Sequence, residues 1–89
     1  MRIKDSIVIT KINDEFALVD SDASKDRFNG LVRFNEETKD IIDIMTNNDV
    51  TYDDIVTKML EKYNVDETKL REDIIKIIEK LNGIKIIIN

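Results

Sequence analysis

The chain has 89 residues and a net charge of −5, and it contains no Cys, His, Trp or Pro. The missing Cys and His exclude disulfides, thiol nucleophiles, the usual zinc ligands and the histidine proton shuttle, and with them most hydrolytic and redox chemistry. We therefore expect no catalytic residues, no metal and no cofactor. A chain of this length is enough for one domain, residues 1–89, with a small continuous core.

The charge is unevenly distributed along the chain. Residues 35–63 carry three basic and eight acidic side chains, which accounts for the whole excess, whereas residues 1–34 and 64–89 are each balanced. No stretch supplies the basic face that nucleic-acid binding usually needs. Lys4, Asp5 and Lys11 interrupt the N-terminal apolar runs, and no segment approaches the roughly 20 apolar residues that span a bilayer. We expect a cytoplasmic protein without a signal peptide or membrane contact.

The first third of the chain is predicted to form strands. Ser6–Ile12 and Glu15–Asp20 are rich in β-branched and aromatic residues, and Asn13-Asp14 between them tolerates a tight turn. This pattern predicts a hairpin. Ser21–Asn29 is polar and is predicted to be a long loop that leads, after a glycine, into a third strand at Leu31–Phe34.

Two capped helices follow with little connecting sequence. Asn35 is suited to cap a helix that begins with two glutamates, buries Ile41, Ile42 and Met45, and ends at Asn47-Asn48. Thr51 with Asp54 three residues later predicts a capping box for the second helix. Its buried stripe is predicted to consist of Ile55, Val56, Met59, Leu60 and Tyr63.

A third helix is predicted from a cap at Asp66 to Asn82, with Gly83 as a left-handed C-terminal cap. The final Ile84–Ile88 run is β-prone and is expected either to pair as a wing strand or to pack as a tail. At helical spacing the third helix has an apolar stripe with a charged rim on one border. The stripe consists of Leu70, Ile74, Ile77, Ile78 and Leu81, and the rim of Asp73, Lys76 and Lys80. This rim is interpreted either as an ion-pair face within the helix or as a peptide-contacting surface.

Several of these positions, taken together, resemble the PqqD-like family, the peptide chaperones also called precursor-peptide recognition elements of ribosomally made, post-translationally modified peptides. The resemblance covers roughly residues 6 to 88. It rests on a diffuse pattern: Leu31 to Thr38, Ile41 and Ile42, Thr51 with Asp54-Ile55, Tyr63, Asp73-Ile74, Ile77-Ile78, Leu81 and Gly83. The chain departs from the family in its Asn47-Asn48-Asp49 turn, which usually contains Gly, and in its long loop before the third strand.

The resemblance implies an α+β, winged-helix-like fold of three antiparallel strands followed by three helices. It also implies that the leader region of a precursor peptide binds as an added strand beside the third strand, in a cleft against the third helix. A meander of three strands leaves the third at an edge, where free N–H and C=O groups accept another extended segment. Carried over by position, the leader-binding residues are Leu31, Val32, Arg33, Phe34, Asp73, Ile74, Ile77 and Lys80, with Lys69 and Lys76 as outer contacts.

About five or six backbone hydrogen bonds, together with a few buried apolar side chains, would give dissociation constants between about nanomolar and micromolar. The implied second partner is a separate tailoring enzyme, such as a radical enzyme, a cyclase, a dehydratase or a leader peptidase. The acidic surface of the first two helices is a candidate for docking that enzyme. The sequence leaves open whether two copies pair through their sheet edges as a homodimer.

Three other interpretations have to be weighed against leader binding. A winged-helix DNA-binding protein would carry a cationic surplus on its recognition helix, whereas Glu67–Asn82 holds four basic and four acidic residues. An acyl carrier protein is also small, acidic and helical, but its attachment serine begins a helix well inside the chain, unlike Ser6. An adaptor or regulatory subunit would use the same strand edge to bind a folded protein.

Overall fold

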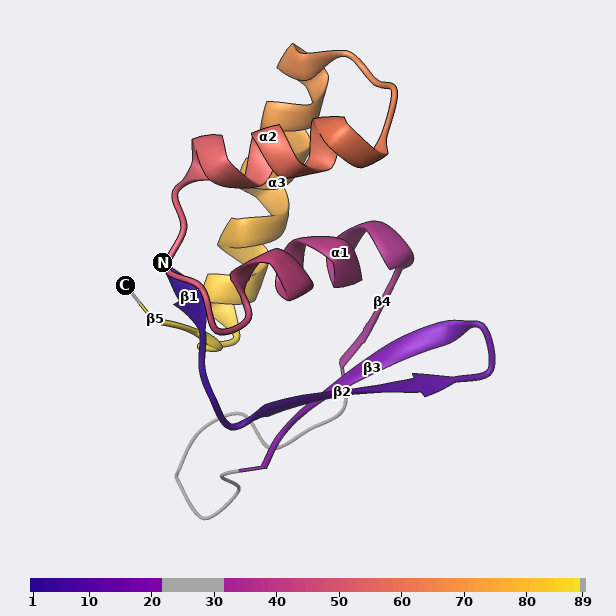
Figure 1. Ribbon diagram of the computed structural model, residues 1–89. Helices are drawn as coiled ribbons and strands as arrows, with labels where there is room; N and C mark the ends of the chain where they lie inside the picture. The colour runs from indigo at the N-terminus through magenta and orange to yellow at the C-terminus, as the bar shows by residue number, and fades with distance from the viewer. Residues whose placement is uncertain (22–31, 89) are drawn as a thin grey trace.

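The structure is a computed structural model that describes residues 1–21 and 32–88. In these ranges three strands form an antiparallel sheet of order β2-β3-β4, and three helices follow β4 along the chain (Figure 1). The strands are β2 Ile7–Ile12, β3 Glu15–Asp20 and β4 Val32–Phe34, and the helices are α1 Glu36–Met45, α2 Tyr52–Lys62 and α3 Glu67–Gly83. The predicted α+β fold is confirmed. The predicted Ser21–Asn29 loop, beyond Ser21, and Leu31 of the predicted third strand lie outside the described residues.

The hairpin forms where it was predicted. Its register pairs Ile12 with Glu15, and Asn13 at the turn takes a φ of 57°. Asn tolerates this left-handed backbone conformation better than most residues. Asn47 takes the same conformation, with a φ of 60°, just after the end of α1, so Asn residues mark both of these predicted chain reversals.

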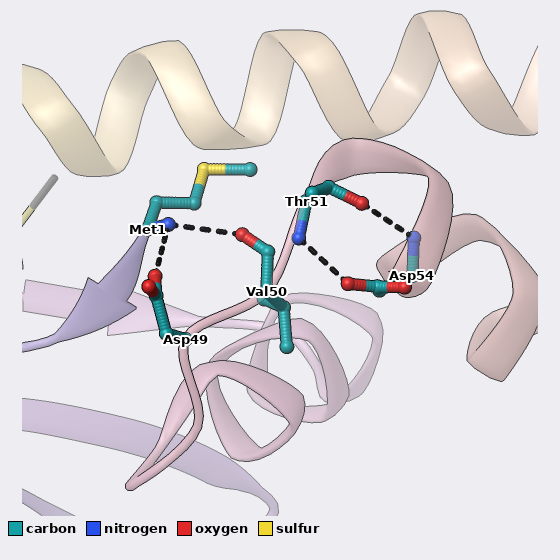
Figure 2. Close-up of polar contacts among 5 residues, drawn as sticks. All are labelled: Met1, Asp49, Val50, Thr51 and Asp54. Atoms are coloured by element: carbon teal, nitrogen blue, oxygen red, sulfur yellow. Dashed lines mark hydrogen bonds and ion pairs between the residues drawn. The ribbon is translucent and has the colours of Figure 1, made fainter.

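All three predicted helix N-caps are confirmed. The Asn35 side chain accepts the N–H of Thr38, and the Asp66 side chain accepts the N–H of Lys69. In α2 the capping box is complete. The Asp54 N–H donates to Thr51 Oγ1 at 3.2 Å, and the Thr51 N–H donates to Asp54 Oδ2 at 2.9 Å (Figure 2).

A second, two-stranded sheet joins regions close to the two ends of the chain. β1 Arg2–Ile3 pairs antiparallel with β5 Ile87–Ile88, near the labelled N and C positions of Figure 1. The backbone of Met1 continues this attachment, because its carbonyl accepts the N–H of Val50 at 2.8 Å. Its ammonium group donates to Asp49 Oδ1 and to the Val50 carbonyl (Figure 2).

The predicted left-handed cap at Gly83 is wrong. The helix continues through Gly83 and is capped by Ile84 with a φ of −93°, and the left-handed residue is Lys85 with a φ of 63°. The later turn lets Ile86 become fully buried and brings Ile87 opposite Ile3. Burial of the isoleucine tail thus decides where the chain turns, at the cost of a left-handed lysine.

The core lies between the sheet and the three helices and extends to the terminal pair of strands. It consists of buried residues from every layer: Ile3, Leu18, Ile41, Ile42, Met45, Ile55, Val56, Met59, Leu70, Ile74, Ile78, Leu81 and Ile86. The predicted helix stripes are confirmed, with Leu60, Tyr63 and Ile77 packed at the border of the core as partly buried members.

One buried ion pair ties the two sheets together. Lys4, just after β1, donates through Nζ to Asp20 Oδ2 at 2.8 Å, at the end of β3. The Asp20 side chain is 1% exposed and that of Lys4 is 16% exposed. A buried carboxylate needs such compensation, so this pair fixes the path of the chain between β1 and β3.

Candidate functional site

Strand β4 is an edge of the three-stranded sheet. In the described part of the chain it pairs only with β3, through Phe16 opposite Phe34, Ala17 opposite Arg33 and Leu18 opposite Val32. The isoleucine tail pairs with β1 instead, so it does not cover this edge. β2 forms the other edge, but none of its residues lines either of the two hollows beside α3.

The backbone of Arg33 points away from β3. In an antiparallel sheet, hydrogen-bonded and non-hydrogen-bonded pairs alternate. The Ser21 N–H donates to the Ser6 carbonyl at 2.8 Å, so the odd-numbered residues of β3 bond toward β2 and the even-numbered ones toward β4. Phe34 and Val32 therefore bond to β3, whereas the N–H and C=O of Arg33 face the open side.

The two faces of β4 have different neighbours. The Arg33 side chain is exposed and forms an ion pair with Glu15, with Nη1 and Oε2 2.9 Å apart. Phe34 points to the opposite face, because neighbouring strand residues alternate in direction. There it stacks against Phe16 with ring centroids 6.1 Å apart. The guanidinium of Arg33 and the aromatic pair thus lie on different sides of the sheet.

A hollow of about 90 Å³ separates β4 from the C-terminal half of α3, and we call it the strand hollow. Its lining is mainly apolar and comes from the sheet, the start of α1 and the end of α3: Leu18, Phe34, Thr38, Ile77, Lys80, Leu81 and Ile84. This is where the sequence predicted a cleft between the third strand and the third helix.

A second hollow of about 120 Å³ lies where α1, α2 and α3 meet, and we call it the helix hollow. Its lining combines apolar side chains with charged ones at the rim: Glu37, Met59, Tyr63, Val65, Asp66, Lys69, Leu70 and Asp73. The two hollows follow one another along α3, because Asp73 lines the helix hollow and Ile77, one turn later, lines the strand hollow.

The predicted site residues therefore divide into groups. Phe34, Ile77 and Lys80 line the strand hollow, whereas Lys69 and Asp73 line the helix hollow. Val32 and Arg33 contribute backbone to the edge strand. Ile74 is 0% exposed and packs in the core, Lys76 is exposed and lines neither hollow, and Leu31 lies outside the described residues.

Sequence reasoning missed several lining residues. Glu37 and Thr38 were given no role beyond the first helix and the family pattern, Ile84 was placed in the β-prone C-terminal run, and Val65 was given no role. The available signal was the apolar character of Val65 in an otherwise polar connection between two capped helices.

The charged rim of α3 is not an ion-pair face in the described structure. Asp73, Lys76 and Lys80 take part in none of the ion pairs formed by the described residues, which leaves their charges available to a ligand. Arg71, on another side of the same helix, binds both Asp53 at 2.7 Å and Glu67 at 3.1 Å. These two carboxylates raise the pKa of Arg71.

A polar cluster holds one wall of the helix hollow. The Tyr63 hydroxyl donates to Asp40 Oδ2, and Lys62 Nζ lies 2.9 Å from the same oxygen. Burial opposes ionisation of Asp40, but the Tyr63 hydroxyl and the Lys62 ammonium together hold its pKa below the ordinary value. The hydrogen bond to Asp40, reinforced by burial, raises the pKa of Tyr63. The cluster fixes the Tyr63 ring against α1.

No group of His, Cys, Asp and Glu suited to a metal ion occurs within residues 1–21 and 32–88. Over the same ranges, none of the helices has the length and apolar character that crossing a bilayer requires.

No protein-family model matches the sequence, and no curated protein matches it at a significant level. Among solved structures, the fold is similar to that of TbiB1 in complex with the TbiA(beta) leader peptide. The TM-score is 0.74 and the sequence identity 19%, over 97% of this chain and 93% of that one. At this identity the likeness establishes the fold, and it covers both the sheet and the three helices.

Proposed function

We propose that this protein binds the leader region of a ribosomally synthesised precursor peptide by strand addition at β4. The observation that carries the proposal is an edge strand with the outward backbone of Arg33 beside an apolar hollow against α3. The likeness of the fold to a protein solved with a leader peptide supports it further. The protein itself catalyses nothing and presents the peptide to a separate tailoring enzyme, such as a radical enzyme, a cyclase or a leader peptidase.

Backbone pairing along the described part of β4 supplies only part of the binding energy. Within the described part of β4, Arg33 offers an outward N–H and C=O, which allows two main-chain hydrogen bonds. At a net 0.5–1.5 kcal/mol each, two such bonds contribute about 1–3 kcal/mol. This falls short of micromolar affinity, which requires about 8 kcal/mol. Pairing at Arg33 alone is therefore insufficient, and we expect apolar leader side chains in the strand hollow to add to the affinity.

Proline at position 33 tests strand addition directly. Arg33→Pro removes the outward N–H without removing a hydrogen bond to β3, and proline is tolerated on an edge strand when its nitrogen faces outward. Arg33→Ala is the matched control, because it loses the same guanidinium and the ion pair with Glu15 but keeps the N–H. Urea unfolding establishes that both variants are folded.

The ligands to titrate are the leader segments of short peptides encoded beside the gene, measured by calorimetry. We expect the native chain to bind a leader, and we expect Arg33→Pro to bind it about fivefold or more weakly than Arg33→Ala. An unrelated peptide should not distinguish the two variants. Equal affinities for the two folded variants would show that the leader does not add to β4. An absence of heat with every leader would contradict leader binding itself.

A further inference from the structure

No residue of β4 lines the helix hollow, so the hollow is not needed for pairing at Arg33. Its floor is apolar, formed by Met59, Tyr63 and Leu70, and Val65 at its rim is 50% exposed. A volume of about 120 Å³ is well below the roughly 300–1,000 Å³ of small-molecule sites. The size suits one side chain of a peptide.

The rim of this hollow has an excess of negative charge. Its lining holds three residues with carboxylates, Glu37, Asp66 and Asp73, and one with an ammonium, Lys69. Among the described residues these four side chains form no ion pair with one another, although Asp66 accepts the backbone N–H of Lys69. An apolar floor under an acidic rim is complementary to a large apolar side chain that has a cationic neighbour.

The helix hollow and the strand hollow lie one after the other along α1 and α3. Glu37 and Thr38 are consecutive residues of α1 and line one hollow each, and Asp73 and Ile77 do the same on α3. From Lys69 to Lys80 the helix rises by about 16 Å, at 1.5 Å per residue. An extended peptide covers that distance in about five residues, at 3.3 Å per residue.

From these contacts we infer that the helix hollow is a second subsite for the leader, which takes a large apolar side chain next to a Lys or Arg, about four to six residues from the side chain held in the strand hollow. The inference rests on the proposed function and adds the sequence pattern that the leader must carry. Even spacings are favoured within this range, because alternate residues of an extended chain point to the same side.

The first experiment selects ligands without assuming a leader. The full chain is used to enrich binders from a library of displayed random peptides long enough to span both hollows. We expect enriched sequences to share two large apolar residues at this spacing, with a basic residue beside one of them. Binders with a single apolar position would overturn the second subsite while leaving peptide binding intact. A library without any enrichment would contradict peptide binding and this inference together.

The second experiment tests whether the basic residue of the peptide lies at the helix hollow. Affinities are measured for the best enriched peptide and for a copy in which norleucine replaces its basic residue. Asp73→Lys is expected to weaken the basic peptide about five- to tenfold and the norleucine peptide less than about twofold. The matched control, Glu79→Lys, makes the same charge change on the same helix but lines neither hollow. It is expected to affect both peptides equally and by less than about twofold.

The apolar contact is tested at Val65, which is exposed enough to be replaced without disturbing the core. Val65→Ser is expected to lower the affinity of both peptides about fivefold, whereas Ile75→Ser, at an exposed position of α3 that lines neither hollow, leaves it unchanged. Equal effects of Asp73→Lys and Glu79→Lys, or of the two serine variants, would overturn the assignment to this hollow.

Discussion

Ile3 lies directly opposite Ile87 in the antiparallel pair of β1 and β5, which are separated by almost the whole length of the chain. This pairing anchors the C-terminal tail on the N-terminal strand. It also keeps the tail away from β4, whose open side is the proposed point of leader attachment.

The tail should contribute strongly to stability through Ile86. The Ile86 side chain is fully buried, and the Ile86 backbone carbonyl accepts the N–H of Lys4 at 2.9 Å. Truncation to alanine removes buried methyl groups and leaves a cavity, so Ile86→Ala is expected to lower the free energy of unfolding by about 2–5 kcal/mol. Urea denaturation measures the loss. Ile88→Ala, in the same tail but exposed, should cost less than about 1 kcal/mol, and equal losses would refute the attachment.

The capping box of α2 gives a second stability prediction. Thr51→Ala removes the acceptor for the Asp54 N–H, and Asp54→Ala removes the acceptor for the Thr51 N–H. Each replacement is expected to destabilise the protein by about 0.5–2 kcal/mol in thermal or urea unfolding. Thr57→Ala, at an exposed position of the same helix, should be neutral or slightly stabilising, because alanine is the better helix former. A loss at Thr57 as large as at Thr51 would mean that the cap is not the cause.

Asp40 is predicted to make stability depend on acid pH. Its pKa is held below the ordinary value of 3.8, so its ionised form contributes stability above that pH, and this contribution is lost as the pH falls through the folded-state pKa. Asp40→Asn is expected to cost about 1–2 kcal/mol at pH 7 and much less near pH 3.

Urea unfolding at both pH values tests this expectation. The matched control is Asp43→Asn, which breaks an exposed pair with Lys39 on the same helix and should cost at most about 1 kcal/mol. A cost at Asp40 that does not change between pH 7 and pH 3 would count against a role for its charge.

The buried pair between Lys4 and Asp20 should be costly to break. Lys4→Met keeps a long apolar side chain but leaves the buried carboxylate without that ammonium, so a loss of about 3 kcal/mol is expected. Lys58→Met is the control, since this exposed lysine forms no ion pair with any described residue. Similar unfolding curves for the two variants would show that Lys4 does not compensate Asp20.

The features that local chemistry controls could be predicted from the sequence. Asn35, Thr51 and Asp66 cap their helices through bonds to residues three positions away, and the apolar stripes follow the helical period, so a short window contains the necessary information. The hairpin at Asn13-Asp14 is local in the same way.

Features that depend on distant contacts could not be predicted. β1 and β5 have two residues each, too few to show a strand period, and they are defined only by pairing with one another. Gly83 is a plausible cap by its own conformational freedom, but burial of Ile86 moves the turn to Lys85. The sequence placed Asp73, Lys76 and Lys80 on one rim, yet Asp73 lines the helix hollow and Lys80 the strand hollow, a division that depends on Glu37 and Thr38 of α1.

Because Arg2 pairs with Ile88, the arrangement of the elements in space does not depend on their order along the chain. Antiparallel partners lie only about 4.5–5.5 Å apart, so a short linker would close the backbone into a ring. If such a ring were reopened at the Asn13-Asp14 turn, the elements would occur in a different sequence along the chain. The open edge at Arg33 and both hollows would still have all of their walls.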